Sequence, residues 1–92
     1  MDSIILGEWF LYIIQCRNGE LYVGIAKDVE KRVKEHNTTR KCRYTRFRKP
    51  VRLIYSEHCD DYAQARKRER AVKKFSRKKK FALIETSKIS RP

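Results

Sequence analysis

Glu69 is the one acidic residue in the most basic stretch of the chain, Arg66 to Lys80, where ten of fifteen residues are Lys or Arg. The apolar residues around it recur in steps of three and four, as on the inner face of a helix: Tyr62, Ala65, Val72 and Phe75. Glu69 falls on the same face. A carboxylate that faces the interior is costly unless a cation pairs with it.

Two kinds of cation fit this carboxylate. Proteins hold Mg²⁺ with one or two carboxylates plus substrate phosphates, so Glu69 alone could serve as the metal ligand at the floor of a catalytic cleft. The structural alternative is an ion pair with a neighbouring Arg. The sequence leaves both interpretations open, and the first predicts phosphate chemistry.

Arg32 and His36 form a second candidate pair. They are four residues apart, so they share one face of a helix, and that face borders the apolar residues Val29 and Val33. An Arg in this place binds phosphate through two hydrogen bonds or makes a salt bridge. A His can relay a proton near neutral pH.

Two tyrosines flank a predicted hairpin turn that contains Asn18-Gly19. A two-residue turn would place Tyr12 and Tyr22 on opposite faces of the sheet. A three-residue loop that begins at Arg17, with Gly19 left-handed and bulged, would place both on one face, with Tyr12 opposite Gly24. A phosphate could then approach Tyr12 closely over Gly24. Residue patterns alone do not choose between the registers.

The elements that must position these residues follow in the order ββαβαα. We predict an α+β fold, a small three-stranded antiparallel sheet flanked by helices, in a single domain over residues 1–92 with its core at about 9–85. The expected strands cover 9–16, 20–26 and 51–57, and the expected helices cover 29–36, about 62–75, and a third after Ser76 that carries Phe81, Ala82 and Ile84.

Smaller details of these elements are also predicted. Asp28, Asp61 and Ser76 are expected to cap the three helices. Strict alternation places Val51, Leu53 and Tyr55 on one face of the third strand. The last residues, 86–92, read as a frayed tail.

The net charge of +13, from 24 basic and 11 acidic side chains, points to a polyanionic partner. We expect DNA as the partner, including branched or flapped DNA, with RNA as an alternative substrate. An acidic membrane surface is the second interpretation of the charge, and we expect no membrane partner. The three cysteines favour a reducing cytoplasm, and residues 1–10 lack the features of a signal peptide or a spanning helix. Nothing in the pattern reports the oligomeric state.

A basic segment at 37–50 is long for a connection, and long loops are often functional. Its Tyr44 could stack on unpaired bases, and we expect its cations and those of the helices to contact phosphates. The predicted nucleic-acid-binding set is Lys27, Arg40, Lys41, Arg43, Tyr44, Arg46, Arg48, Arg66, Lys73, Arg77 and Lys78. A basic module that binds nucleic acid without cutting it is the rival hypothesis.

In order along the chain, these motifs resemble the GIY-YIG endonuclease superfamily, and most of all its small stand-alone bacterial members. The first signature would be Phe10-Leu11-Tyr12 and the second Tyr22-Val23-Gly24. The helix with Arg32 and His36 and the later Glu69 complete the set. Phe10 departs from the pattern, because the family has a glycine there.

The resemblance implies hydrolysis of a DNA phosphodiester that depends on Mg²⁺ or Mn²⁺. It implies that Glu69 ligates the metal, that Arg32 neutralises the phosphate, and that Tyr12 or Tyr22 activates the nucleophile with support from His36. Both tyrosines must then share a face, which favours the bulged three-residue loop. The prediction requires Glu69, Arg32 and both phenols to meet around one hollow.

Overall fold

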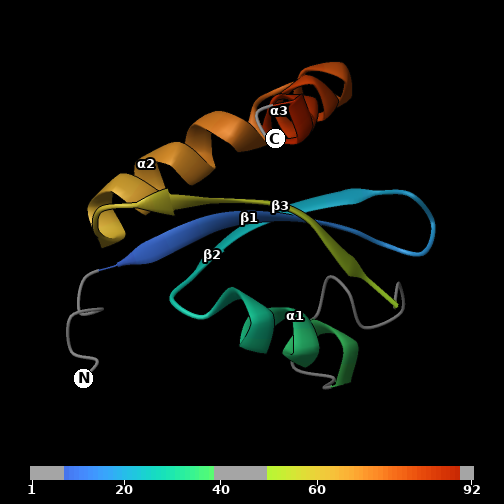
Figure 1. Ribbon diagram of the computed structural model, residues 1–92, viewed down its shortest axis with the longest axis horizontal. Coiled ribbons are helices and arrows are strands. Elements are labelled where there is room, and N and C mark those ends of the chain that lie inside the picture. The colour runs from blue at the N-terminus through green and yellow to red at the C-terminus, as the bar shows by residue number, and fades with distance from the viewer. Residues whose placement is uncertain (1–7, 39–49, 90–92) are drawn as a thin grey trace.

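Three strands form one antiparallel sheet with helices on both faces (Figure 1). The structure is a computed structural model that describes residues 8–38 and 50–89, with side chains as far as residue 86. The elements are β1 (Trp9–Gln15), β2 (Leu21–Ala26), α1 (Val29–Thr38), β3 (Arg52–Cys59), α2 (Tyr62–Lys73) and α3 (Arg77–Ile89). The predicted fold class and element order are confirmed. The strand order is β2-β1-β3, so β2 and β3 are the two edges.

The hairpin between β1 and β2 uses the bulged loop. Gly19 has a φ of +92°, in the left-handed region that glycine adopts without steric cost, and its N–H donates to the Cys16 carbonyl. The resulting register pairs Tyr12 with Gly24 and Ile14 with Tyr22. Both tyrosines therefore lie on one face of the sheet, as the resemblance required.

The third strand does not keep strict alternation. Ile14 lies opposite Leu53 and Ile13 lies opposite Tyr55, so Ile54 is an extra residue in β3. A bulge of this kind turns the residues on either side of it to opposite faces. The expectation that Val51, Leu53 and Tyr55 share one face is therefore wrong for Tyr55, which lies opposite Ile13 whereas Leu53 lies opposite Ile14.

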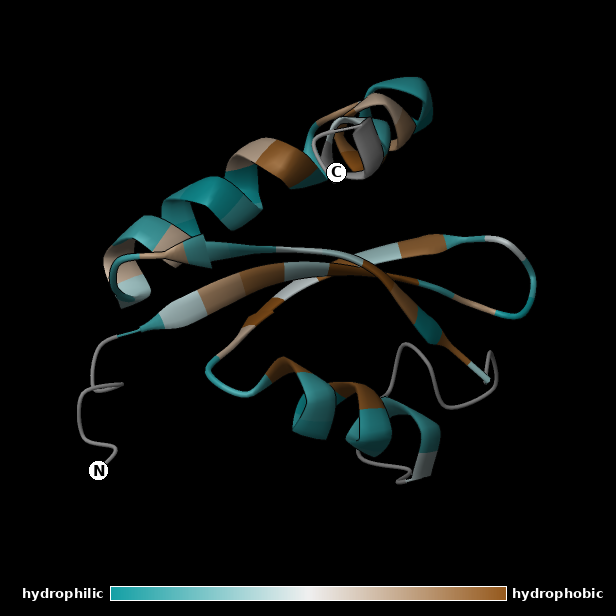
Figure 2. Ribbon diagram, viewed as in Figure 1, coloured by the Kyte–Doolittle hydropathy of each residue, from teal (hydrophilic) through white to brown (hydrophobic). Residues whose placement is uncertain are grey.

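Each face of the sheet has its own apolar cluster. On the side of α2 and α3, Leu11, Ile13 and Val23 pack with the helical residues Ala65 and Val72. The cluster on the α1 side has five buried members, Tyr12, Ile14, Cys16, Ala26 and Val51, with Tyr22, Val29 and Val33 packed against them. Figure 2 shows the apolar segments of α1 turned toward the sheet.

The predicted helix caps are confirmed. Asp28 accepts a hydrogen bond from the backbone N–H of Lys31, Asp61 from that of Gln64, and Ser76 from that of Lys79. Helix α1 continues two residues further than expected. Helix α3 runs to Ile89, so the prediction of a frayed segment from residue 86 is wrong for its first four residues.

A partly buried ion pair between Arg68 and Glu57 links α2 to β3. Arg68 donates two hydrogen bonds to Glu57, at 2.6 Å and 3.2 Å, and Tyr55 donates a third at 2.5 Å. Burial, and then the bond to Glu57, raise the pKa of Tyr55 to about 12. This network commits the Glu57 carboxylate to holding α2 against β3.

Among the described helices, none has the length and apolar character needed to cross a bilayer.

Candidate active site

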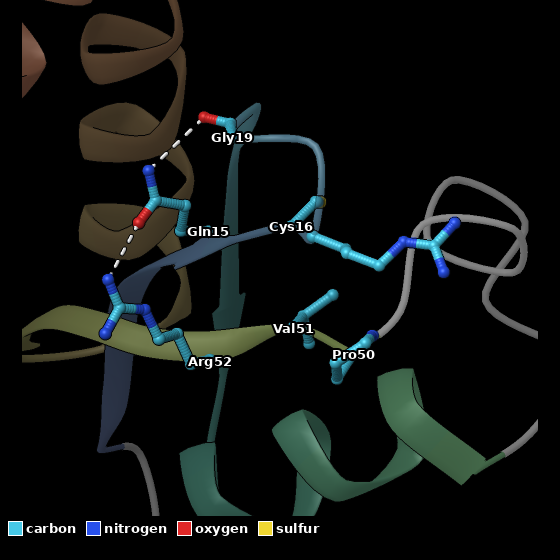
Figure 3. A pocket seen from close by; sticks show the side chains of 7 residues that line it. Gln15, Cys16, Gly19, Pro50, Val51 and Arg52 are labelled. Atoms are coloured by element: carbon cyan, nitrogen blue, oxygen red, sulfur yellow. Dashed lines mark hydrogen bonds between the residues drawn. The ribbon is translucent and has the colours of Figure 1, made fainter.

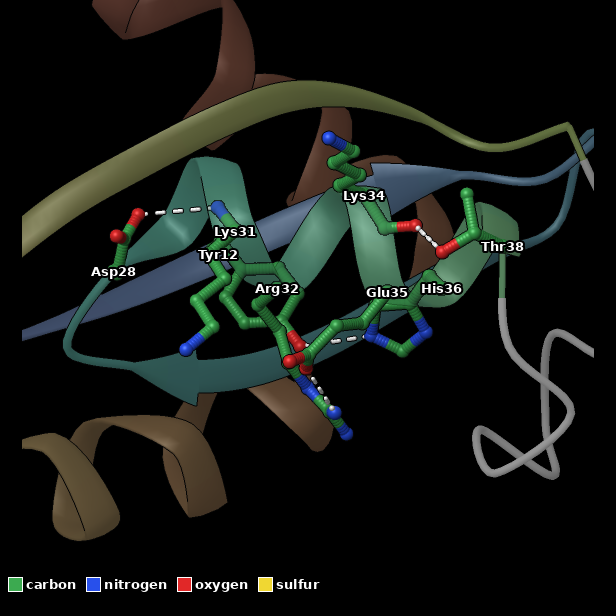
Figure 4. A network of polar contacts seen from close by, with 8 residues as sticks. All are labelled: Tyr12, Asp28, Lys31, Arg32, Lys34, Glu35, His36 and Thr38. Carbon is green, nitrogen blue, oxygen red and sulfur yellow. Dashed lines mark hydrogen bonds and ion pairs between the residues drawn. The ribbon is translucent and has the colours of Figure 1, made fainter.

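Two tyrosines and a histidine meet between α1 and the sheet. The rings of Tyr12 and Tyr22 have centroids 6.3 Å apart, and His36 lies 6.1 Å from the first and 5.1 Å from the second. Tyr12 and Tyr22 come from neighbouring strands, and His36 comes from the last turns of α1. Figure 4 shows Tyr12, Arg32, Glu35 and His36 gathered at this place. Four of the five predicted catalytic residues therefore belong to one region.

Tyr12 is a core residue, with 1% of its surface exposed. Its hydroxyl lies 3.0 Å from Nε2 of His36. Its ring occupies the space over Gly24, where a Cβ would lie 2.6 Å from the phenolic oxygen. The expectation that a phosphate approaches Tyr12 over this glycine is therefore wrong, because the phenol itself fills the space.

His36 is kept neutral. It is buried, and burial lowers its pKa to about 4, with help from the positive charge of Arg32 and against the opposing charge of Glu35. A neutral imidazole has one N–H and one acceptor nitrogen. With its proton on Nδ1, the ring accepts the hydrogen bond of the Tyr12 hydroxyl at Nε2.

The buried histidine predicts a loss of stability in mild acid. Between pH 4 and 6.5 the unfolded chain binds a proton at His36 that the folded chain does not, so stability rises with pH in this window. Acidification from pH 7.5 to 5 is expected to lower the free energy of unfolding by about 1–2 kcal/mol, after allowance for solvent screening. Urea unfolding at both pH values measures the change.

The matched control for this pH effect is His36→Gln, which has no group that titrates in this range. Its stability is expected to change by less than half as much between the same pH values. His58 is half-exposed and remains in both proteins, so it contributes equally to both. An equal acid loss in the variant would contradict the assignment to His36.

Arg32 lies at the rim of this cluster, with its Nη1 3.1 Å from Oε1 of Glu35. Both side chains are more than a third exposed, and exposed ion pairs contribute little to stability. The guanidinium can therefore exchange this carboxylate for a phosphate at small cost. Glu35 was not predicted as a site residue, although its spacing of three from Arg32 on a helix is visible in the sequence.

Glu69 forms ion pairs with cations of its own helix, as the structural alternative to a metal site predicts. Its carboxylate is buried and contacts Arg66 Nη1 at 2.7 Å and Lys73 Nζ at 3.1 Å. It lies on α2, whose buried residues pack on the sheet face opposite to that of Tyr12. Glu69 and the two tyrosines therefore do not meet around one hollow, because they lie on opposite faces of the sheet.

Strand β2 is where the two layers meet. Arg68 turns one flank of α2 toward β3, and Arg66 and Lys73 lie on the other flank beside Glu69, while α2 also packs against β2. Tyr22 is a partly exposed residue of β2 on the other face. Since β2 is an edge strand, one substrate strand that lies along it can reach both faces.

A family model described as the GIY-YIG catalytic domain matches residues 8–82. The chain belongs to the GIY-YIG family. This is a nuclease family, and the matched residues contain both tyrosines, Arg32, His36 and Glu69.

The GIY-YIG relatives include small bacterial proteins of nearly the same length. UPF0213 protein SSP2268 of Staphylococcus saprophyticus is 48% identical over 79 residues, which cover 86% of this chain and 96% of that one. UPF0213 protein DP2720 of Desulfotalea psychrophila is 48% identical over 80 residues, or 86% of this chain and 73% of that one.

Two solved GIY-YIG-like structures have the same fold. The solution structure of EF2693 from E. faecalis has a TM-score of 0.63 at 32% identity and covers 92% of this chain and 91% of its own. The solution structure of UPF0213 protein BH0048 from Bacillus halodurans has a TM-score of 0.57 at 34% identity and covers 86% and 84%. These names state no substrate.

Among the described residues of this GIY-YIG chain, few side chains are placed to ligate a metal. Among the described residues, no group of three His, Cys, Asp or Glu side chains is placed to hold an ion. Glu69 is a hard oxygen ligand, and its present partners are half-exposed cations of its own helix that can move outward. A single carboxylate fits Mg²⁺ or Mn²⁺ when substrate oxygens and water complete the shell.

The predicted nucleic-acid-binding residues divide into two groups. Lys27, Lys73, Arg77 and Lys78 are exposed and Arg66 is partly exposed. The other six, Arg40, Lys41, Arg43, Tyr44, Arg46 and Arg48, lie outside the described residues.

A cavity of about 380 Å³ lies at the turn end of the hairpin (Figure 3). It is lined by Gln15, Cys16, Arg17, Gly19, Pro50, Val51 and Arg52. None of these residues is an acid or a histidine, so this cavity offers neither a carboxylate ligand nor a general base.

Proposed function

We propose that this GIY-YIG protein is a divalent-metal-dependent endonuclease that hydrolyses a DNA phosphodiester and selects its substrate by shape rather than by sequence. The observation that carries the proposal is the tyrosine–histidine cluster, in which a neutral His36 lies between a buried phenol and a partly exposed one. Arg32 at the rim supplies the positive charge that a phosphate needs.

The two tyrosines are assigned different roles because one is buried and the other is partly exposed. Tyr22 is the one that can meet a water molecule. In its phenolate form, with its own proton released to solvent, it takes the proton from the attacking water. Tyr12 is enclosed, and its hydroxyl holds the His36 ring in place. The neutral ring in turn packs edge-on against Tyr22, with ring centroids 5.1 Å apart, and so positions its phenol.

Positive charge for the substrate strand comes from both faces of the sheet. Arg32 binds a non-bridging oxygen of the scissile phosphate and stabilises the extra negative charge of the transition state, which is often the largest catalytic effect. Glu69, on the other face, would hold a Mg²⁺ or Mn²⁺ ion, which would supply positive charge to the substrate backbone. Arg66 and Lys73 are 43% and 52% exposed, so they can also contact neighbouring phosphates.

The rival function is a module that binds nucleic acid without cutting it. The ion pairs of Glu69 with Arg66 and Lys73 favour it, because they already neutralise the acid. A binder that contacts about six phosphates is expected to show a slope near −5 for log affinity against log salt. The nuclease shows this slope too, so binding alone does not separate the two functions.

Metal-dependent cleavage separates them. We expect the protein to cut flapped or branched DNA in Mg²⁺ or Mn²⁺, to cut plain duplex more slowly, and to leave all three intact in EDTA. Glu69→Gln and Arg32→Ala are each expected to lower the cleavage rate by about a hundredfold or more. Gel assays with end-labelled substrates measure the rates.

Arg52→Ala serves as the matched control for Arg32→Ala, because Arg52 is an exposed arginine whose hydrogen bond goes to Gln15, away from the tyrosine cluster. Its cleavage rate is expected to stay within a few-fold of the unmodified protein. Tight binding with the steep salt dependence, but no metal-dependent cut in any substrate, would establish the rival function.

A further inference from the structure

An exposed aromatic pair lies where α2 begins. Tyr62 packs edge-on against Trp9, with ring centroids 4.9 Å apart, and Lys27 Nζ lies 5.6 Å from the Trp9 ring. Tyr62 is 53% exposed, and among the described residues only Leu53 is another large hydrophobic side chain so exposed. One face of a tyrosine is thus presented to solvent beside a lysine.

A row continues from this pair along α2, in which two cations, Arg66 and Lys73, lie on either side of Glu69, with which both are paired. Tyr62, Arg66, Glu69 and Lys73 follow steps of four, three and four residues, which is one stripe of a helix. The stripe spans about 16 Å, at 1.5 Å per residue. It lies on the flank of α2 away from Arg68 and β3, and α2 also packs against the edge strand β2.

The direction of this row follows from which end of β2 lies near each end of α2. Trp9 and Lys27 place the start of α2 near the end of β2. Beyond Lys73, Arg77 at the start of α3 lies near the start of β2, where it lines a cavity of about 280 Å³ with Glu20, Leu21 and Lys80. The row therefore runs antiparallel to β2, with Glu69 near its middle.

We propose that this row is the track of a single-stranded nucleic-acid segment, with an unpaired base stacked on Tyr62 and its phosphates on Arg66, Lys73 and Arg77. The inference rests on the proposed nuclease function and narrows its substrate to one with an unpaired strand beside the cut. A positively charged groove with aromatic side chains on which bases stack is the general design of single-strand binding.

The spacing and chemistry of the row favour a single strand over a duplex. The stripe is one line of side chains about 16 Å long, so a single strand can follow it. A duplex needs only cations, and it has no use for an exposed tyrosine. A base has a π-face, and stacking on an aromatic side chain is worth about 1–3 kcal/mol per base.

The single tryptophan of the chain reports on this site directly. Titration of the whole protein in EDTA with a short oligothymidine is expected to quench Trp9 fluorescence, while a blunt duplex binds with little quenching. Tyr62→Ala is expected to weaken oligothymidine binding about tenfold and duplex binding less than twofold. Tyr62→Phe keeps the ring and is expected to bind as the unmodified protein does.

Leu53→Ala is the matched control, since Leu53 is 40% exposed on the opposite edge strand. It is expected to change neither affinity. Tyr62 is exposed, and circular dichroism checks that its variants keep the fold. An equal loss of both affinities in Tyr62→Ala, or no loss, overturns the track, as does oligothymidine binding that leaves Trp9 fluorescence unchanged.

The binding test does not depend on cleavage. If oligothymidine binding requires Tyr62 but no substrate is cut in metal, the track stands and the nuclease function fails. If flapped DNA is cut and Tyr62→Ala cuts it as fast as the unmodified protein, the nuclease function stands and the track fails.

Discussion

Tyr22→Phe is expected to lower the rate of DNA cleavage about a thousandfold while leaving the fold intact. The change removes one hydroxyl from a partly exposed ring and keeps the ring's contact with His36. A general base typically contributes a factor of 10² to 10⁴, and Tyr22 is the phenol of the cluster that water can reach. Single-turnover cleavage at saturating protein measures the rate without a contribution from binding.

Tyr12→Phe is the matched control, because it removes a hydroxyl from the neighbouring ring. It leaves Nε2 of the buried His36 without its 3.0 Å partner, so we expect a loss of about 1–2 kcal/mol in stability. Its rate at a temperature where the protein is folded is expected to fall less than tenfold. A larger rate loss in Tyr12→Phe than in Tyr22→Phe would reverse the assigned roles.

Local chemistry explains what could be predicted from the sequence. Asn18-Gly19 specifies a hairpin, and Asp28, Asp61 and Ser76 cap their helices because their side-chain oxygens accept orphan backbone N–H groups. The register of β1 and β2 could not be predicted from local chemistry alone. Turn residues allowed two registers, and only the resemblance to a nuclease family selected the one that is found.

Packing between distant segments explains what was missed. The extra residue Ile54 in β3 depends on how the strand fits against β1, and no pattern within the strand announces it. The burial of Glu69 was predicted from its helix face, but not its layer, because that depends on which side of the sheet α2 covers. The filling of the space over Gly24 by Tyr12 depends on the rotamer of a residue twelve positions away.

Gly24→Ala is expected to destabilise the protein by about 2 kcal/mol, although alanine suits a strand better than glycine. The new Cβ would lie 2.6 Å from the hydroxyl oxygen and 2.7 Å from Cζ of Tyr12. The ring is fully buried and bonded to His36, so it has little room to move. Overpacking of this kind costs about 1–3 kcal/mol or more, and the gain in strand propensity offsets about 0.5–1 kcal/mol of it. Urea unfolding measures the difference.

A double-mutant cycle shows whether the Tyr12 ring is the cause. Tyr12→Leu removes the ring and is expected to cost about 3 kcal/mol by itself, but Gly24→Ala should then add almost nothing, for a coupling of about 2 kcal/mol. Gly19→Ala is the matched glycine control. Its cost comes from a positive φ at the turn and should add fully to Tyr12→Leu. Additive losses for Gly24→Ala as well would show that the glycine of the second signature serves the strand backbone. Coupled losses would show that it makes room for the phenol that holds His36, and so links the two signature segments through packing.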